Sequence, residues 1–170
     1  MANQTAGALA RPPSSRAQDP TEKLGRSILR ARLVEDKLGS LYRAGRIVGG
    51  VYLGRGQEAF SAAGGLNLRK GDVYAPLIRD MAGRLAFGEP LVDAVRTYLG
   101  SRLGPMRGRD GNIHRGDLEL GILPMISHLG AMISATAGVL LASGCGEKNS
   151  GWAWPALVTE LLPRDPFTKG

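Results

Sequence analysis

The chain has 170 residues, of which 43% are hydrophobic and 22% charged, a composition typical of a soluble globular protein with one domain. Its net charge of +7 at pH 7 favours anionic partners such as phosphate groups, nucleic acid or an acidic protein surface. The single cysteine, Cys145, excludes an internal disulfide and any multi-cysteine metal site. No apolar run reaches the roughly 18 residues of a membrane span, and no secretory signal is recognised. We therefore expect a cytoplasmic protein.

The chain divides into three parts by composition. Residues 1–20 are rich in Pro, Ser, Ala and Arg, which predicts a disordered leader. Residues 21–142 contain the periodic apolar segments of a folded domain. Residues 143–170 have no clear period and contain Trp152 and Trp154, the only tryptophans of the chain. We interpret this last part as an aberrant tail.

Helices dominate the expected secondary structure. A first helix should begin at Asp19 and Pro20, which suit the N-cap and first turn, and end at Gly45. Further helices are predicted over 57–68, 79–87, 91–99 and 128–142, the last one buried; short extended pieces are predicted near 69–74 and 122–127.

A glycine- and arginine-rich segment separates the fourth predicted helix from the last extended piece. It reads GSRLGPMRGRDGNIHRG over 100–116 and predicts a mobile, basic loop. Four arginines, Arg102, Arg107, Arg109 and Arg115, could steer an acidic ligand or surface, or could only be solvated.

Four ordered segments together resemble a known family. They read GRIVGGVYLGRGQEAF, LRKGDVYAPLIRDMAGRLAFG, GSRLGPMRGRDGNIH and ISHLGAMISATAGVLLA. From about Leu38 to Ala142 the chain resembles the N-terminal part of the alpha chain of thiamine-diphosphate-dependent 2-oxo acid dehydrogenases. The resemblance implies an α/β fold with a parallel sheet flanked by helices, of which this chain would be an incomplete, mostly helical fragment.

The resemblance also implies an activity. The family decarboxylates a 2-oxo acid oxidatively and passes the acyl group to a lipoyl carrier, as an oxidoreductase acting on an oxo group with a disulfide acceptor. Thiamine diphosphate and Mg²⁺ are the expected cofactors. The expected partners are a dehydrogenase beta chain, in a heterotetramer, and the lipoyl acyltransferase component.

Cofactor-binding residues are carried over by position. Arg79 matches the arginine of the family's Y-R-x-H-G segment, which contacts the diphosphate. Ser127, Leu129 and Gly130 resemble the turn that holds the aminopyrimidine ring, with Leu129 under the cofactor's bend. Tyr52 replaces a histidine that many relatives place before GQEA, so no catalytic base is identified.

The chemistry of these residue types agrees with the resemblance. A guanidinium fork matches diphosphate oxygens, and Arg79 at the start of a predicted helix would add backbone N–H donors to an anion site. The alternative for Arg79 is a surface ion pair with Asp80 or Glu89.

Two histidines and one glutamate have further expected roles. His114 could act as an acid, a base or an anion contact, or could be an exposed loop residue. His128, at a loop-to-helix junction, favours a capping or packing role. Glu58 is expected to begin a helix, where its charge suits the dipole.

The chain lacks the family's metal-binding residues. Relatives hold Mg²⁺ with a Gly-Asp-Gly turn after a core strand and a later Asn pair, and this sequence contains neither, so no metal ligand is predicted. When the codons of the tail are reread from each third nucleotide, they permit GKELGVGLACIGDGATSTGPFHEG from position 146, which restores the turn. We interpret this as a frameshift near residues 142–144, in the gene or its recorded sequence; the alternative is a genuinely divergent tail.

Other classes of function are weaker. A small basic nucleic-acid-binding protein would suit the charge, but aromatic residues make up only 5% of the chain and no reading motif is present. A partner that pairs with a beta chain without catalysis is the third possibility.

Overall fold

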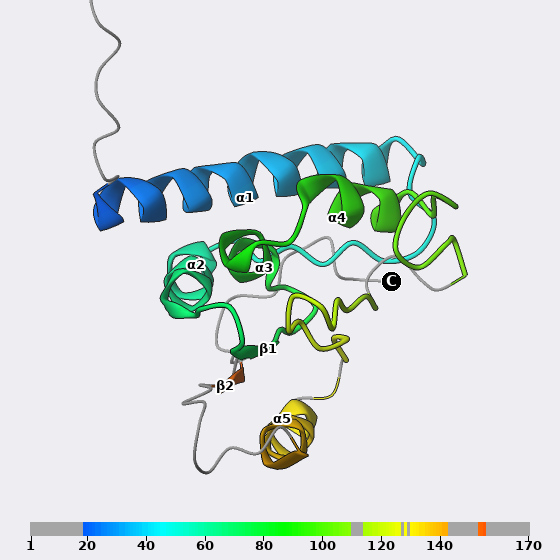
Figure 1. Ribbon diagram of the computed structural model, residues 1–170. Coiled ribbons are helices and arrows are strands. Elements are labelled where there is room, and N and C mark those ends of the chain that lie inside the picture. Colours follow the sequence, from blue (N-terminus) through cyan, green and yellow to red (C-terminus); the bar gives the residue numbers. More distant parts are fainter. Residues whose placement is uncertain (1–18, 110–113, 127, 129, 143–152, 156–170) are drawn as a thin grey trace, which may run out of the picture.

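The computed structural model describes residues 19–109, 114–126, 128, 130–142 and the backbone of 153–155. Its elements in chain order are α1 (Pro20–Arg43), α2 (Glu58–Asn67), β1 (Val73–Ala75), α3 (Met81–Phe87), α4 (Leu91–Tyr98), α5 (Ala131–Ala142) and β2 (Ala153–Pro155). In Figure 1, α1 runs along one side of the molecule, with α2, α3 and α4 beneath it, and the strands and α5 lie toward the opposite end. The described part is mostly helical, as expected.

The first helix forms as its sequence predicts. The Asp19 side chain accepts a hydrogen bond from the Thr21 N–H at 3.1 Å, and Pro20 occupies the first helical position. Both features stabilise a helix start, because the first N–H groups have no partner within the helix. The buried face of α1 consists of Ala31, Glu35 and Leu38, so this face carries one charged residue.

The second and third helices pack closely because their contact surface is built from small residues. A Cβ atom added to Gly65 of α2 would lie 2.2 Å from the Gly83 carbonyl oxygen of α3, which is an impossible contact. Glycine at position 65 therefore allows the two backbones to approach each other. α2 begins at Glu58, as predicted.

The short strand β1 is flanked on both sides. Tyr74 donates its N–H to the Gly121 carbonyl and accepts from the Leu123 N–H, both at 2.9 Å, so the segment around Ile122 runs parallel to β1. β2 pairs with β1 in parallel, with Tyr74 opposite Trp154. The predicted extended piece near Ile122 is confirmed as this isolated bridge.

Two of the three apolar clusters hold the layers together. The larger one joins α1, the segment 47–53, α3, α4 and Met125. The smaller one joins β1 to Leu123 and to Met132 of α5. Residues 122–126 thus connect the helical layer to the layer that contains β1 and α5.

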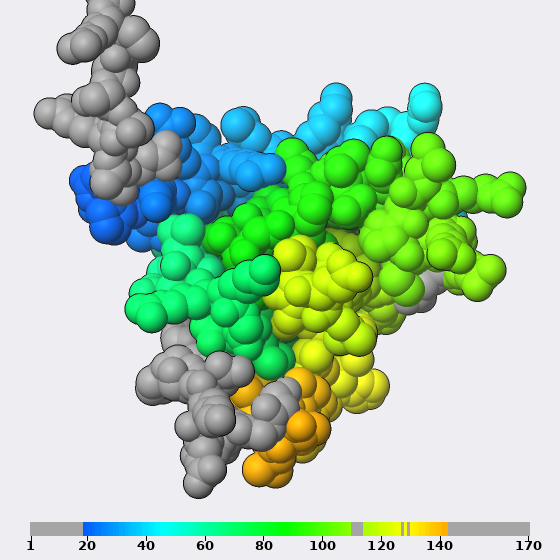
Figure 2. Space-filling view, viewed as in Figure 1, coloured from blue at the N-terminus to red at the C-terminus, as the bar shows by residue number. Residues whose placement is uncertain are grey.

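One helix differs from its prediction. α5 was expected to be buried, yet within it only Met132 and Thr136 are buried, whereas Ile133 and Leu141 are 48% and 78% exposed. In Figure 2, α5 lies at the end of the described part that is farthest from α1. The described residues cover one stripe of this apolar helix, because its neighbours among the described elements are the short strands β1 and β2. No helix in the described ranges is long and apolar enough to cross a bilayer.

Candidate functional site

Arg79 lies four residues beyond the end of β1, in the turn before α3. The helix begins at Met81, with Asp80 as its N-cap, so the prediction that Arg79 opens the helix was wrong. Asp80 accepts a hydrogen bond from the Gly83 N–H at 3.2 Å. This N–H at the start of the helix is therefore not free to bind an anion. Any anion held at Arg79 would therefore be held mainly by the guanidinium.

The guanidinium of Arg79 has no carboxylate partner in the described part of the chain. The side chain is half-buried, and its guanidinium faces the ring of Tyr52, whose centroid lies 5.9 Å from the Arg79 Cζ. The two ion pairs considered from the sequence are wrong, because Asp80 and Glu89 bind other groups. A half-buried cation without a counter-charge is a suitable anion contact.

Asp80 is fully buried and anchors the turn that carries Arg79. Its carboxylate accepts a short hydrogen bond from the Tyr74 hydroxyl of β1 and another from the Gly83 N–H of α3. Burial raises the pKa of Asp80 above its ordinary value, despite these hydrogen bonds. Asp80 thus ties β1 to α3 on either side of Arg79.

The main chain of Arg79 packs against a second buried acid through Gly54. A Cβ atom at Gly54 would lie 2.2 Å from the Arg79 carbonyl oxygen, so only glycine fits there. The Gly54 N–H donates to Oε1 of Glu35 on α1 at 2.9 Å. Glu35 is 2% exposed, and its Oε2 is buried without a hydrogen-bond partner among the described residues.

The environment of Glu35 disfavours its charge. Burial raises the pKa of Glu35 to about 7, against the opposing effect of the Gly54 hydrogen bond. The nearby charge of Glu58 raises it further, whereas Arg32 and Arg55 lower it. Glu35 thus has one hydrogen-bonded oxygen, which holds Gly54 against the main chain of Arg79, and one oxygen without a partner among the described residues.

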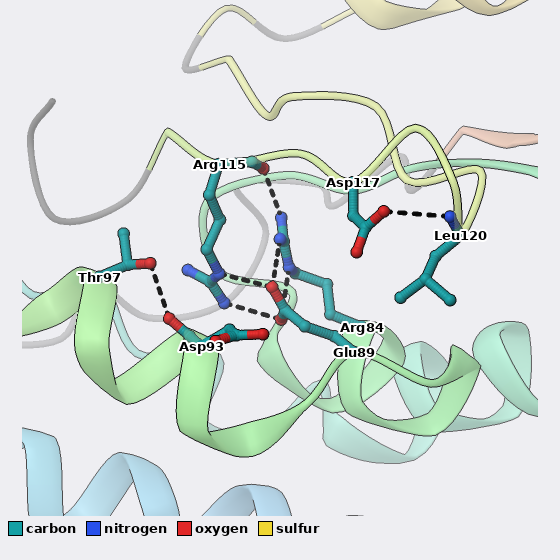
Figure 3. A network of polar contacts seen from close by, with 7 residues as sticks. All are labelled: Arg84, Glu89, Asp93, Thr97, Arg115, Asp117 and Leu120. Carbon is teal, nitrogen blue, oxygen red and sulfur yellow. Dashed lines mark hydrogen bonds and ion pairs between the residues drawn. The ribbon is translucent and has the colours of Figure 1, made fainter. Parts of the chain in front are cut away.

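A separate buried network joins α3, the turn before α4 and the end of the basic loop. Both carboxylate oxygens of Glu89 accept hydrogen bonds from Arg84, at 2.6 and 2.9 Å, and from Arg115, at 2.6 and 2.8 Å. Arg84 also donates to the backbone carbonyl of Arg115 at 3.2 Å. Figure 3 shows the two guanidinium groups converging on the one carboxylate.

This network corrects the prediction for Arg115. The residue is 1% exposed, and its guanidinium lies 5.8 Å from the centre of the Tyr98 ring, so it is neither a solvated loop residue nor a surface steering charge. The reason is Glu89, whose carboxylate compensates the cation. Burial alone would raise the pKa of Glu89. The hydrogen bonds from Arg84 and Arg115 outweigh this effect and lower the pKa to about 2.

The remaining basic loop is compact where it is described. Successive backbone hydrogen bonds link Gly104 to Ser101, Arg107 to Gly104, and Arg109 to Met106. Arg102, Arg107 and Arg109 are exposed. Their exposure fits both expected roles, steering of an acidic ligand or surface and solvation alone.

The other residues predicted for the site are placed only in part. His114 is half-buried directly before Arg115, and His128 is exposed rather than packed. Ser127 and Leu129 lie outside the described residues. Gly130 has a φ of +78° in the turn before α5, and α5 packs on β1 through Met132. The start of α5 and the turn with Arg79 thus both adjoin β1.

Metal ligands are not gathered in the described ranges. No group of three or more His, Cys, Asp or Glu residues there could hold a metal ion. Arg79, by contrast, has the charge and the free donors that a diphosphate needs. The described residues therefore include a cationic contact suited to the anionic part of an organic cofactor.

Comparison of the sequence with known proteins identifies relatives of this chain. The chain is 31% identical, over 121 residues, to the pyruvate dehydrogenase E1 component subunit alpha of Rhizobium meliloti, a match that covers 71% of this chain. The chain is a homologue of dehydrogenase E1 alpha subunits. It is also 28% identical, over 116 residues and 68% of its length, to the alpha subunit of acetoin:2,6-dichlorophenolindophenol oxidoreductase of Bacillus subtilis. No family model matches the chain.

The homology covers a limited part of these relatives. The matched region corresponds to 35% of the length of the Rhizobium meliloti protein and 35% of the Bacillus subtilis protein. A third relative, the mitochondrial pyruvate dehydrogenase E1 component subunit alpha-2 of Arabidopsis thaliana, is 28% identical over 81% of this chain and 38% of its own length. The chain thus spans little more than a third of the length of these relatives.

Proposed function

We propose that this chain carries one wall of the thiamine diphosphate site of a 2-oxo acid dehydrogenase, in the role of an E1 alpha subunit. Arg79 would contact the diphosphate, and Ser127, Leu129 and Gly130 would form the turn against the aminopyrimidine ring. The substrate would be a 2-oxo acid, and the partners a beta chain and a lipoyl acyltransferase. The observation that carries the proposal is the half-buried guanidinium of Arg79, which has no carboxylate partner in the described ranges.

The position of Arg79 supports this role. In open sheets with parallel strands, ligands bind outside the carboxyl ends of the strands. Arg79 follows β1 at this edge, and β2 runs parallel to β1, so the carboxyl ends of the two strands lie at the same edge. The carboxyl ends of both strands are where a diphosphate and its metal would be expected.

The position of β2 is compatible with the proposed frameshift. In the reread tail, Leu-Ala-Cys stands in place of Ala153–Pro155, and the Gly-Asp-Gly turn follows at positions 157–159. A turn at these positions would lie beyond the carboxyl end of β2, beside the residues that follow β1. We propose that a change of reading frame has removed the metal-binding half of the site from this chain.

The chemistry assigned to this chain is limited to positioning. When bound, thiamine diphosphate supplies the carbanion and the electron sink of the reaction. Arg79 would neutralise and orient the diphosphate, while Asp80, Glu35 and Gly54 would hold the main chain of Arg79 in place. No step is assigned to Mg²⁺, because the described residues offer no ligand set for it.

Calorimetric titration with thiamine diphosphate and Mg²⁺ tests the proposal on the chain itself. We expect no binding of micromolar affinity, because the sequence lacks the Gly-Asp-Gly turn. Micromolar affinity would contradict the loss of the metal-binding half. Nucleotides across codons 142–170 that cannot yield Gly-Asp-Gly in any frame would end the frameshift proposal.

A restored form of the protein tests the role of Arg79. The chain read in the alternative frame, continued downstream and co-produced with a beta chain, should bind thiamine diphosphate. Arg79→Ala should weaken that binding by about 10-fold or more, since hydrogen bonds to charged groups contribute about 1.5–3 kcal/mol each. Arg69→Ala, at an exposed position, is the matched control. Equal affinity of the Arg79→Ala and unmodified proteins would contradict the proposal.

A further inference from the structure

We propose that Tyr52 is a positioning residue that holds the Arg79 guanidinium over its ring and orients it toward a phosphate-bearing ligand. The inference rests on the proposed function for the identity of the ligand, but the contact itself belongs to this chain. The ring centre of Tyr52 and the Cζ of Arg79 are 5.9 Å apart, within the range of a cation–π interaction.

One short segment holds both ends of Arg79. Tyr52 faces the guanidinium, and Gly54, two residues later, packs against the Arg79 carbonyl oxygen. Glu35 fixes Gly54 through the hydrogen bond from its N–H. The segment 51–54 thus positions both the side chain and the main chain of Arg79. A long arginine side chain normally loses rotamer entropy when it binds a ligand. Because Arg79 is already held in place, this entropy cost of binding is smaller.

The Tyr52 ring is itself held in place. It packs against the larger apolar cluster, and it folds back over Gly50. A Cβ atom at position 50 would lie 2.8 Å from Cε2 of the ring and 2.9 Å from its hydroxyl oxygen. Any side chain at this position would push the ring away, so Gly50 permits the orientation in which the ring meets Arg79.

The environment of Arg79 distinguishes it from the other buried and half-buried arginines of the described ranges, each of which is paired with a carboxylate. Arg84 and Arg115 are buried against a carboxylate, and Arg32 is half-buried and paired with Glu58. Arg79 is held over an aromatic face instead, which orients a guanidinium without neutralising it. Its positive charge therefore remains available to an anion.

Nuclear magnetic resonance of the full chain tests the contact directly. The Arg79 Nε–Hε signal, assigned with Arg79→Lys, should show a ring-current shift from Tyr52. Tyr52→Leu should abolish that shift, and Tyr52→Phe should retain it, because the ring and not the hydroxyl makes the contact. Gly50→Ala should also reduce the shift, since it displaces the ring while leaving Tyr52 intact.

The controls separate positioning from a general loss of structure. Tyr42→Leu, at an exposed position on α1, should leave the Arg79 signal unchanged. Circular dichroism of each variant should show the helical content of the unmodified chain. An Arg79 signal that is identical in the unmodified chain and in folded Tyr52→Leu would overturn the inference.

Inorganic pyrophosphate connects the contact to the ligand. At millimolar concentration it should perturb the Arg79 signal of the unmodified chain, and Tyr52→Leu should weaken this interaction about 2- to 5-fold. Equal affinity of the unmodified chain and Tyr52→Leu would overturn the positioning role. If pyrophosphate leaves Arg79 unperturbed while the ring-current result holds, the proposed function fails and the Tyr52 contact stands.

Discussion

Two buried glutamates occupy opposite electrostatic situations in this molecule. Glu89 lies in the turn between α3 and α4, beside the end of the basic loop, and Glu35 lies where α1 meets Gly54, which packs against the Arg79 main chain. They are similarly buried, at 6% and 2% exposure. Glu89 has two guanidinium partners, and its pKa falls to about 2, whereas Glu35 has a single backbone donor, and burial raises its pKa to about 7.

The comparison teaches that burial alone does not decide the charge state of an acid. Burial acts to raise the pKa of both carboxyls, but Glu89 accepts hydrogen bonds from two guanidinium groups, whereas Glu35 accepts one from a backbone N–H and lies near the charge of Glu58. At the junction around Glu89 the carboxylate is fully hydrogen-bonded by two guanidinium groups, although Nη1 of Arg115 has no hydrogen-bond partner among the described residues. Among the described residues, the region around Glu35 and Arg79 keeps an acid with one unsatisfied oxygen and a cation without a carboxylate partner, a combination typical of functional sites.

Removal of the Glu89 charge should have the largest effect. Glu89→Gln leaves Arg84 and Arg115 buried without a counter-charge, and should lower the free energy of unfolding by about 3–5 kcal/mol. Urea denaturation followed by circular dichroism measures the change. Glu119→Gln, at an exposed site, should change it by less than about 0.5 kcal/mol. A similar small change for both variants would show that the network contributes little.

The pH dependence of stability should distinguish the two acids. Glu89, with its lowered pKa, stabilises the fold at neutral pH, and this contribution is lost as the pH falls from about 4.5 to about 2. Glu35 has a raised pKa, so the folded state binds its proton more tightly than the unfolded state does. The free energy of unfolding should therefore fall as the pH rises from about 4.5 to about 7.

Glu35→Gln isolates the second effect. The glutamine oxygen can still accept from the Gly54 N–H, but no charge is buried at high pH. Relative to the unmodified chain, the variant should gain up to about 3 kcal/mol of stability between pH 4 and pH 8. Denaturation curves across that range measure the difference. Parallel pH profiles of the two proteins would show that Glu35 does not titrate there.

A methyl group at position 54 should have a somewhat smaller effect. Gly54→Ala forces the Arg79 carbonyl away, because the added Cβ would lie 2.2 Å from its oxygen. We expect a loss of about 1–3 kcal/mol in unfolding free energy. Gly25→Ala is the control: nothing lies within 4 Å of its Cβ position in α1, so alanine should stabilise by about 0.5–1 kcal/mol. Equal effects at the two sites would refute the close approach.

A surface ion pair near Glu35 should matter least. Arg55 pairs with Asp36, and both side chains are about half exposed. Arg55→Gln should change the unfolding free energy by less than about 1 kcal/mol, because water and salt screen such pairs. Since Arg55 lowers the pKa of Glu35, the variant should also shift the Glu35 titration upward. A large stability loss would place Arg55 among the structural charges with Arg84 and Arg115.

The sequence predicted the local structure better than the long-range contacts. The Asp19 cap and the apolar spacing of α1 are local signals, as are the breaks at Gly88 and Pro90, and the helices form within a few residues of their predicted bounds. The partners of Glu89 could not be predicted, since Arg115 is far away in sequence and nothing local distinguishes it from the other arginines of the loop.

Glu35 could have been recognised from its spacing. It follows Ile28 and Ala31 and precedes Leu38 at intervals of three and four, so it lies on the apolar face of α1. A charge on such a face signals either a buried partner or a perturbed acid. The exposed surface of α5 gave no comparable signal, because an apolar sequence does not reveal which neighbours cover it.

The pairing of β2 with β1 has a consequence for the order in which the chain folds. Val73 and Ala153 are brought together across almost half of the chain, whereas α2 and α3 form from neighbouring segments. Contacts between distant segments form late, because the intervening loop must first be closed. During folding, we therefore expect the amides of the helical layer to become protected from hydrogen exchange before β2 pairs with β1.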